Sequence, residues 1–526
     1  MPEMLLQDLL RWTGAEMLNR SPDFADPRCR LDGICSDSRA IRRGCLFIAL
    51  CGEHFNGHDF LTQAVAQGAG GLLISDRSAW QDLGGKASGT QSAEEQHNLA
   101  GLPVLLVADT LKALQAIASG YRDRLTAPVV AITGSVGKTT TRQMISACLQ
   151  PVLQVHQTAG NLNNEIGLPQ TLLQAGPDDQ VIVLEMGMRG PGEIALLSRI
   201  ARPDIAVITC IGWSHIGRLG SQSAIMSAKA EILAGMKPEG LLMLNGDDPL
   251  LLDLGCSHAG HRRLAYITTG SDPAAVSRLI AAGAEFVLCA GSIVNTGTDV
   301  SFTAIYHVPG RAPLQVPVHL PFPGLHHVRN ALFGLSAAHA LQVDPFRAAA
   351  GAAGCRNTGS RQHLIRIGPA VLMDDTYNAA PESMQAALET LAGMAGTGHR
   401  KLAAIGCMLE LGDFAAEAHR QVGELAARLG YELLLVIGPQ AEDLLVGARS
   451  VRPDLPSCVC ADLDDMTNRL LSTLKAGDHL LIKGSRAFGM EQVSRSLKRQ
   501  LEPVAPDEAP SPDEPEQSAA AKELMQ

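Results

Sequence analysis

The 526-residue sequence predicts an α/β protein of three domains, on three observations. Short apolar segments alternate with segments of helical periodicity, as in βαβ units around a mostly parallel sheet. One apolar segment runs through a glycine-bounded turn into a helix, and several others end in polar turns, where open parallel sheets bind ligands. The predicted domains are 1–108, a small α/β domain; 109–345, a central P-loop-type parallel-sheet domain; and 346–500, a Rossmann-like α/β domain.

The first domain is expected to contain a few short strands. They are predicted at Cys45–Leu50, Gly71–Ser75 and Val104–Val107, with a helical segment near Phe60–Gln67. The stretch Lys86–Gly101 is rich in Gly, Ser, Gln and Glu, which predicts an exposed loop.

The second domain begins with a predicted helix near Leu111–Arg124 and has the clearest strand–helix alternation. Besides the strand before the glycine turn, apolar strands are predicted at Val181–Leu184, Ile205–Thr209 and Leu241–Leu244. Residues 284–320 change to short strands with turn signals, which predicts an antiparallel appendage.

The third domain repeats the α/β pattern. Strands are predicted at Ala370–Met373, Leu402–Ile405, Leu433–Ile437 and His479–Ile482. Each is followed by a polar or glycine-containing turn, respectively DDTYN, GCM, GPQ and KGSR. Ligand-binding groups are therefore expected at the carboxyl ends of these strands.

Composition restricts the classes of function. Hydrophobic residues make up 46% and charged residues 18%, as in globular proteins. Only 4% aromatics and a net charge of −11 disfavour nucleic-acid binding. The final segment, 501–526, is acidic and rich in Pro, Ser and Ala, and is predicted to be disordered. The twelve cysteines lack metal-site spacing, and from the composition of the first residues and the lack of a long apolar run we expect neither a signal peptide nor a membrane span. We expect a cytoplasmic monomer.

The most informative segment is Val129–Cys148, VVAITGSVGKTTTRQMISAC. Its strand, turn and helix N-terminus form an anion cradle in which backbone N–H groups converge on phosphate. Lys138 is expected to reach the β- and γ-phosphates of a nucleotide, and Thr139 to ligate Mg²⁺. Ile132 occupies the first glycine position of the usual motif, and an ordinary αβ turn is the alternative reading. The turn residues are Gly134, Ser135, Val136, Gly137, Lys138, Thr139 and Thr140.

Further polar residues lie near predicted strand ends, each with a structural alternative. Glu185 ends VIVLE and His215 follows IAVITCIGW, but either side chain could be incidental. The same holds for Lys229 on an alanine-rich helix, which alone is more typical of a solvated helix face. Asparagines in GNLNNEIG and polar groups in DDTYN and KGSR could likewise serve turns or helix caps.

Taken in order, eleven segments between Ser36 and Leu497 resemble the Mur ligase family of ATP-dependent amide-forming enzymes of peptidoglycan assembly. They are SDSRAIRRGCLFIAL, FNGHDF, TGSVGKTTT, AGNLNNEIGLP, LEMGMRGPGEI, HIGRLGS, AKAEIL, HHVRNAL, DDTYNAAPESM, MLELGDFAAEAH and IKGSRAFGME. NLNNEIG, LEMG-x-x-x-x-GEI and MLELG are most similar to the members that add D-alanyl-D-alanine to UDP-N-acetylmuramoyl-tripeptide. Cys407 departs from the pattern, because the family commonly has Asp there.

The resemblance implies a reaction in which a substrate carboxylate attacks the γ-phosphate of ATP and the resulting acyl phosphate is attacked by an amine. Two Mg²⁺ ions are expected to neutralise the charges. Lys138, His215 and a carbamylated Lys229 are the implied catalytic residues. The implied metal ligands are Thr139, Glu185, His215 and Lys229.

The remaining implied contacts are divided among three ligands. ATP is expected to contact the phosphate loop together with Asn330, Arg361, Asp375, Tyr377 and Asn378. The UDP-linked substrate is expected to contact Asp37, Ser38, Arg39, Asn161, Asn163 and Asn164, which makes the first domain a nucleotide-sugar-binding domain. The incoming amine, D-alanyl-D-alanine, is expected to contact Lys483 and Arg486.

Two alternatives remain. One is another ligase of the same superfamily, either a MurE-like enzyme that adds a single amino acid or a folylpolyglutamate synthetase. The other is a P-loop ATPase without ligase activity, which would have no need of a separate nucleotide-sugar domain or of the KGSR and DDTYN turns.

Overall fold

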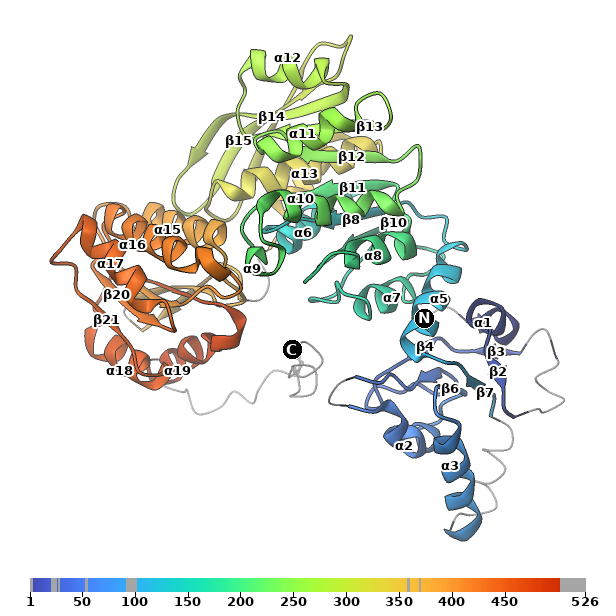
Figure 1. The fold of residues 1–526 in the computed structure, drawn as a ribbon. Coiled ribbons are helices and arrows are strands. Elements are labelled where there is room, and N and C mark those ends of the chain that lie inside the picture. The colour runs from blue at the N-terminus through green and yellow to red at the C-terminus, as the bar shows by residue number, and fades with distance from the viewer. Residues whose placement is uncertain are drawn as a thin grey trace.

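A computed structural model describes residues 3–19, 26, 29–52, 55–90, 102–356, 360–368 and 370–501. Figure 1 shows three bodies, coloured blue, green to yellow, and orange, each built around its own sheet. The α/β fold class is confirmed. The acidic segment expected to be disordered lies outside the described residues, apart from Leu501 at the end of the last helix. None of the helices in the described ranges is long and apolar enough to cross a membrane.

The N-terminal body contains a five-stranded sheet of order β2-β7-β6-β5-β4, parallel except for β2. A two-stranded sheet of β1 and β3 lies beside it. The element bounds are β1 Met4–Leu5, α1 Leu6–Thr13, β2 Glu16–Met17, β3 Arg30–Leu31, β4 Ile34–Cys35, β5 Leu46–Ile48, η2 Gly57–Phe60, α2 Leu61–Ala66, β6 Gly71–Ile74, α3 Arg77–Thr90 and β7 Val104–Leu106.

The strands and helix predicted for this body are present, but the predicted loop Lys86–Gly101 is wrong in its first part. Residues 86–90 continue helix α3, and 91–101 lie outside the described residues. Gly89 and the Gly, Ser, Gln and Glu content of the segment suggested a loop, although glycine disfavours a helix interior only by about 1 kcal/mol.

The central body contains a nine-stranded sheet of order β16-β15-β14-β13-β12-β11-β8-β10-β9. Its strands are β8 Val129–Thr133, β9 Val155–Gln157, β10 Val181–Glu185, β11 Ile205–Ile208, β12 Leu241–Asn245, β13 Arg263–Thr268, β14 Ala284–Asn295, β15 Val300–His307 and β16 Leu314–Leu320. Its helices are α5 Thr110–Arg122, α6 Lys138–Leu149, α7 Gly167–Leu172, α8 Glu193–Ala201, α9 Ile216–Leu219, α10 Gln222–Ala230, η3 Glu231–Ala234, α11 Pro249–His258, α12 Pro273–Ala281, α13 His326–Ala340 and α14 Pro345–Ala353.

Both faces of this sheet are covered, as the near-continuous apolar strands require. Val130 and Ile132 of β8 pack in one core with α6 and α13, whereas Val129 and Ala131 belong to the core on the opposite face. The antiparallel strands expected over 284–320 are confirmed. The prediction of a separate appendage is wrong, because β14 pairs in parallel with β13 and the three strands extend the main sheet.

The C-terminal body contains a six-stranded sheet of order β17-β18-β22-β19-β20-β21, parallel except for β17. Its strands are β17 His363–Ile367, β18 Ala370–Asp375, β19 Lys401–Gly406, β20 Leu433–Ile437, β21 Ser457–Val459 and β22 His479–Lys483. Its helices are α15 Pro381–Ala395, η4 Gly412–Phe414, α16 Ala415–Arg428, α17 Ala441–Val451, α18 Leu463–Thr473, η5 Arg486–Phe488 and α19 Glu491–Leu501. The four strands predicted here are present.

Candidate active site

The phosphate-loop sequence adopts the strand–turn–helix geometry that it predicts. β8 ends at Thr133 and α6 begins at Lys138, with Gly137 at φ 81° as its N-cap. Gly134 has φ 148°, and a Cβ there would lie 1.9 Å from Thr209 Oγ1, so only glycine fits. The Lys138 ammonium donates to the carbonyls of Gly134, at 2.8 Å, and Ser135, at 3.3 Å. Burial lowers its pKa, against the opposing effect of Glu185.

Glu185 lies beside this loop because β10 and β11 flank β8 in the sheet. The side chain is 2% exposed, and Asn163 Nδ2 donates to its Oε1 at 2.8 Å. Its other oxygen, Oε2, has no hydrogen-bond partner among the described residues, and the nearest cation is Arg142 Nε at 3.6 Å. An anionic oxygen buried without a partner is costly, so the position is suited to a cation.

The oxygen atoms of Thr139 and Glu185 suit Mg²⁺, which needs few protein ligands, better than a metal ion that is bound by protein side chains alone. Thr139 lies in the first turn of α6, is 8% exposed, and lines the same cavity as Glu185. Within the described ranges, no group of three His, Cys, Asp or Glu side chains converges to hold a metal. Mg²⁺ commonly takes one or two protein oxygens and completes its shell with water and substrate phosphates.

His215 follows β11 and lies at the N-terminus of α9, with φ 66°. Its Nδ1 lies 2.6 Å from Oε2 of Glu410, which belongs to the C-terminal body. This contact lowers the pKa of Glu410. The sequence pattern singled out the segment MLELG that contains Glu410, but it gave no sign that this side chain reaches His215.

Lys229 is not on a solvated helix face. It lies on α10, is only 2% exposed, and is one of the largest fully buried side chains. Burial, reinforced by the charge of Lys138, holds the pKa of its ammonium well below the usual range. A lysine in such surroundings carries a larger neutral fraction, and a neutral amine is nucleophilic.

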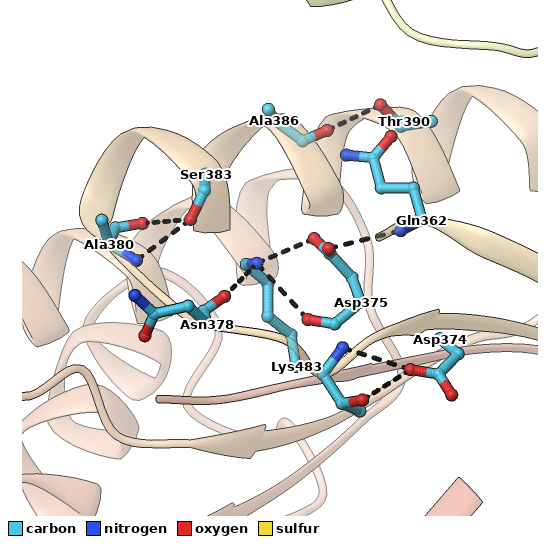
Figure 2. A network of polar contacts seen from close by, with 10 residues as sticks. Gln362, Asp374, Asp375, Asn378, Ala380, Ser383, Ala386, Thr390 and Lys483 are labelled. Atoms are coloured by element: carbon cyan, nitrogen blue, oxygen red, sulfur yellow. Dashed lines mark hydrogen bonds and ion pairs between the residues drawn. The ribbon is translucent and has the colours of Figure 1, made fainter. Parts of the chain in front are cut away.

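Asp375 and Lys483 form an ion pair, although the sequence assigned Asp375 to ATP and Lys483 to the incoming amine. They are in register on the parallel strands β18 and β22. The Lys483 ammonium lies 2.8 Å from Asp375 Oδ2 and donates to the Asn378 carbonyl at 2.7 Å (Figure 2). Burial raises the pKa of Asp375, and the nearby Lys483 opposes that shift. The ammonium therefore has protein partners, and the predicted contact of Lys483 with the incoming amine substrate stays a prediction.

The other basic residue of the KGSR turn lies elsewhere. Arg486 is paired with Glu491 at 3.3 Å and is not among the residues that line the cavity. Arg361 does line it, with its guanidinium 3.9 Å from the centre of the Tyr377 ring. Asn330 on α13 accepts a hydrogen bond from Thr141 of α6 at 3.0 Å, so it lies directly behind the phosphate loop.

In the N-terminal body, Asp37 and Arg39 form an ion pair with Nη2 and Oδ2 at 2.7 Å, and this pairing lowers the pKa of Asp37. Next to them, Ser36 Oγ accepts from Gln170 Nε2 of the central body at 2.6 Å. Asn164 has a structural contact, because its Oδ1 accepts from the backbone N–H of Gly167, the first residue of α7, at 2.9 Å.

A cavity of about 1910 Å³ connects most of these groups, although Gly134, Lys229 and Arg486 are not among its lining residues. This exceeds the roughly 300–1,000 Å³ typical of a pocket for one small ligand, so it has room for more than one substrate. The sequence-predicted residues that line it are Asp37, Ser38, Arg39, Ser135, Val136, Gly137, Lys138, Thr139, Thr140, Asn161, Asn163, Asn164, Glu185, His215, Asn330, Arg361, Asp375, Tyr377, Asn378 and Lys483. They come from all three bodies.

Sequence reasoning missed Arg142 and Glu382. Arg142 follows the phosphate loop by one helical turn and lies beside Glu185, a relation visible only once β8 and β10 are neighbours. Glu382 of the C-terminal body lines the cavity and accepts a hydrogen bond from the Trp213 backbone at 2.8 Å, and burial raises its pKa.

Fold and site together define a phosphate-loop nucleotide-binding protein whose ligand cavity is shared by three α/β bodies. Comparison with known proteins gives the family: residues 30–122 match the Mur ligase family catalytic domain, 132–338 the Mur ligase middle domain, and 360–486 the Mur ligase glutamate ligase domain. The chain belongs to the Mur ligase family.

Relatives and solved structures agree with this. A UDP-N-acetylmuramoyl-tripeptide–D-alanyl-D-alanine ligase of Synechocystis sp. is 37% identical, covering 89% of this chain and 92% of its own. The ligase of the same name from Bacillus subtilis is 34% identical, over 89% and 93%. A crystal structure of MurF from Acinetobacter baumannii superposes with a TM-score of 0.78 at 27% identity, over 95% and 99% of the two chains. MurF ligase from Thermotoga maritima in complex with ADP gives 0.69 at 26%, over 89% and 97%.

Proposed function

We propose that the protein joins D-alanyl-D-alanine to UDP-N-acetylmuramoyl-tripeptide at the expense of ATP, in peptidoglycan precursor synthesis. The curated relatives named for this reaction match most of the chain in support of it. The observation that carries the proposal is the single cavity in which a phosphate loop meets residues of all three bodies. A ligase that brings three substrates together needs such a junction.

The proposed reaction has two steps, formation of an acyl phosphate and formation of the amide bond. An oxygen of the tripeptide carboxylate attacks the γ-phosphorus of ATP, the bond to the β-phosphate oxygen breaks, and ADP leaves. The dipeptide nitrogen then attacks the acyl carbon, inorganic phosphate leaves, and the nitrogen loses a proton. Lys138 and the loop N–H groups stabilise the negative charge on the transferred phosphoryl group.

Two Mg²⁺ ions are part of the proposal. They would reduce the repulsion between the carboxylate and the phosphates. Thr139 and Glu185 would hold one, which is consistent with the unpartnered Glu185 Oε2. His215 and Lys229 would hold the other or contact the acyl phosphate.

Lys229 fits this role only after modification, because an ammonium cannot bind a cation. Its amine would add CO₂ to give a carbamate and release one proton, and the product has the carboxylate-like oxygens that Mg²⁺ prefers. Its burial and lowered pKa favour the neutral amine that this addition needs.

We assign the rest of the cavity by body. Residues 1–108, with Asp37, Ser38 and Arg39, would bind the UDP-linked substrate, assisted by Asn161 and Asn163. Residues 109–345 would bind the phosphates. Residues 346–500 would receive the adenine side of ATP, through Arg361 and Tyr377, and the incoming amine. A cytoplasmic location and a monomeric state stay predictions of the sequence.

The test is identification of the product. Purified protein, ATP, Mg²⁺, UDP-N-acetylmuramoyl-tripeptide and D-alanyl-D-alanine should give a species heavier than the tripeptide substrate by the dipeptide minus one water. A parallel reaction contains a single amino acid in place of the dipeptide. If only that reaction gives a product, heavier by one amino acid minus one water, the MurE-like alternative holds. If it finds ATP hydrolysis without any coupled product, the ATPase alternative holds.

A further inference from the structure

His215 and Glu410 form a contact between two bodies at the edge of the cavity. We propose that Glu410 is a positioning residue for His215: its carboxylate fixes the tautomer and orientation of the imidazole, so that the ring is set for the reaction only when the C-terminal body is docked. The inference rests on the proposed role of His215.

The geometry defines which ring nitrogen is used. Nδ1 of His215 lies 2.6 Å from Glu410 Oε2, and a carboxylate can only accept, so Nδ1 carries the proton. In the neutral imidazole, Nε2 is then the nitrogen with the free lone pair. Because His215 lines the cavity, that lone pair is the one available to a cation or a reacting group.

The backbone conformations of His215 and Glu410 bring their two side chains together. His215 has φ 66° and Glu410 has φ 64°, left-handed conformations that non-glycine residues rarely adopt. Such conformations persist where surrounding contacts hold them, commonly at functional sites. The Gly217 N–H donates to the Glu410 carbonyl at 2.9 Å.

Two glycines allow this approach. A Cβ on Gly217 would lie 2.6 Å from the backbone nitrogen of Gly412, and a Cβ on Gly412 would lie 2.9 Å from the Gly217 Cα. Any larger residue at either position would push α9 away from the Glu410 segment. The close packing therefore sets the distance that the side-chain contact requires.

The two bodies do not depend on Glu410 alone for docking. Glu382 accepts from the Trp213 backbone at 2.8 Å, and the Trp213 and Phe414 rings pack edge to face with centroids 5.1 Å apart. Removing the Glu410 carboxylate should therefore leave the bodies docked while releasing the imidazole. Carboxylate partners of ligating histidines typically contribute about 10–100-fold in metal affinity or activity.

The experiment compares Glu410→Ala and Glu410→Gln with Glu417→Gln, an exposed glutamate of α16 with 64% side-chain exposure, as the matched control. Long-range ¹H–¹⁵N spectra of the metal-free, ¹⁵N-histidine-labelled protein report the tautomer, with the His215 signal assigned by its loss in His215→Gln. We expect the Nδ1–H tautomer in the wild type and in Glu417→Gln, and a mixture of tautomers in Glu410→Ala. The Gln variant keeps an acceptor oxygen and should retain much of the wild-type signal.

Kinetics provide the second readout. Glu410→Ala should lower kcat about 10–100-fold with little change in KM for ATP, and Glu410→Gln should restore part of the loss. An unchanged His215 tautomer and unchanged kcat in a folded Glu410→Ala protein would overturn the inference. Should Glu410→Ala fail to fold, Glu410→Asp takes its place, because its side chain is one methylene shorter and no longer reaches Nδ1. A mixture of His215 tautomers and a lowered kcat in Glu410→Asp would support the inference, and a wild-type tautomer together with wild-type kcat would overturn it.

Failure of the proposed function gives a different pattern. Full activity of His215→Gln would remove the catalytic role of the histidine, whereas the tautomer measurement would still report whether Glu410 orients it.

Discussion

The ammonium of Lys483 lies 2.8 Å from the carboxylate of Asp375, and the two residues face each other in register on neighbouring parallel strands. Their side chains are 2% and 10% exposed. The pair therefore holds the ends of β18 and β22 together at the point where the C-terminal body borders the cavity.

Lys483→Ala should destabilise the protein strongly. Breaking a buried ion pair by removing one partner typically costs about 3–5 kcal/mol, because the other charge is left buried without compensation. Arg486→Ala, three residues further along, is the matched control, because Arg486 is about half exposed and its ion pair should contribute only about 0–1 kcal/mol. Urea unfolding of both variants checks this, and equal stabilities would contradict it.

Lys138→Ala should lower kcat by roughly a hundredfold or more, because the variant lacks the cation that stabilises the transferred phosphoryl group. Lys112→Ala removes a lysine with 83% side-chain exposure and serves as the control for general charge effects. Steady-state ADP production measures both. Near-normal turnover of Lys138→Ala would refute the phosphate-loop interpretation.

Lys229→Ala should lose most activity and still bind ATP, because the phosphate loop is intact in this variant. Labelled ¹³C-bicarbonate should give a carbamate signal in the wild-type protein that is missing from Lys229→Ala. If the variant is fully active, the buried lysine has only a structural task.

Binding of an ATP analogue with the UDP-linked tripeptide should bring the bodies closer together. The cavity of about 1910 Å³ is larger than ATP alone needs, and its lining residues come from separate bodies. Closure would also exclude water from the acyl phosphate. Small-angle X-ray scattering should show a smaller radius of gyration with both ligands, and superimposable curves would argue against closure.

The phosphate loop and the strand ends were predictable because local sequence dictates them. An apolar run, glycines at the strained turn and a helix start are enough to fix the geometry around Lys138. The alternation of strands and helices predicted the parallel sheet, and the pairing of β10 with β8 in that sheet places Glu185 beside the loop.

Pairings between distant segments were not predictable in the same way. The contacts of Lys483 with Asp375 and of His215 with Glu410 depend on which strands become neighbours and how two bodies dock. Burial is likewise a property of the assembled core, so the sequence around Lys229 resembles a solvated helix although the side chain is 2% exposed. Asn164, in an asparagine-rich segment, accepts a hydrogen bond from the first residue of α7, which begins three residues later.

The central claim is that one cavity couples ATP cleavage to joining a tripeptide and a dipeptide. The most direct measurement is ADP release with UDP-N-acetylmuramoyl-tripeptide and D-alanyl-D-alanine, each alone and together. We predict rapid release only when both are present, because the first step needs the carboxylate and turnover needs the amine. Equal rates with a single amino acid in place of the dipeptide, or with neither substrate, would contradict the account.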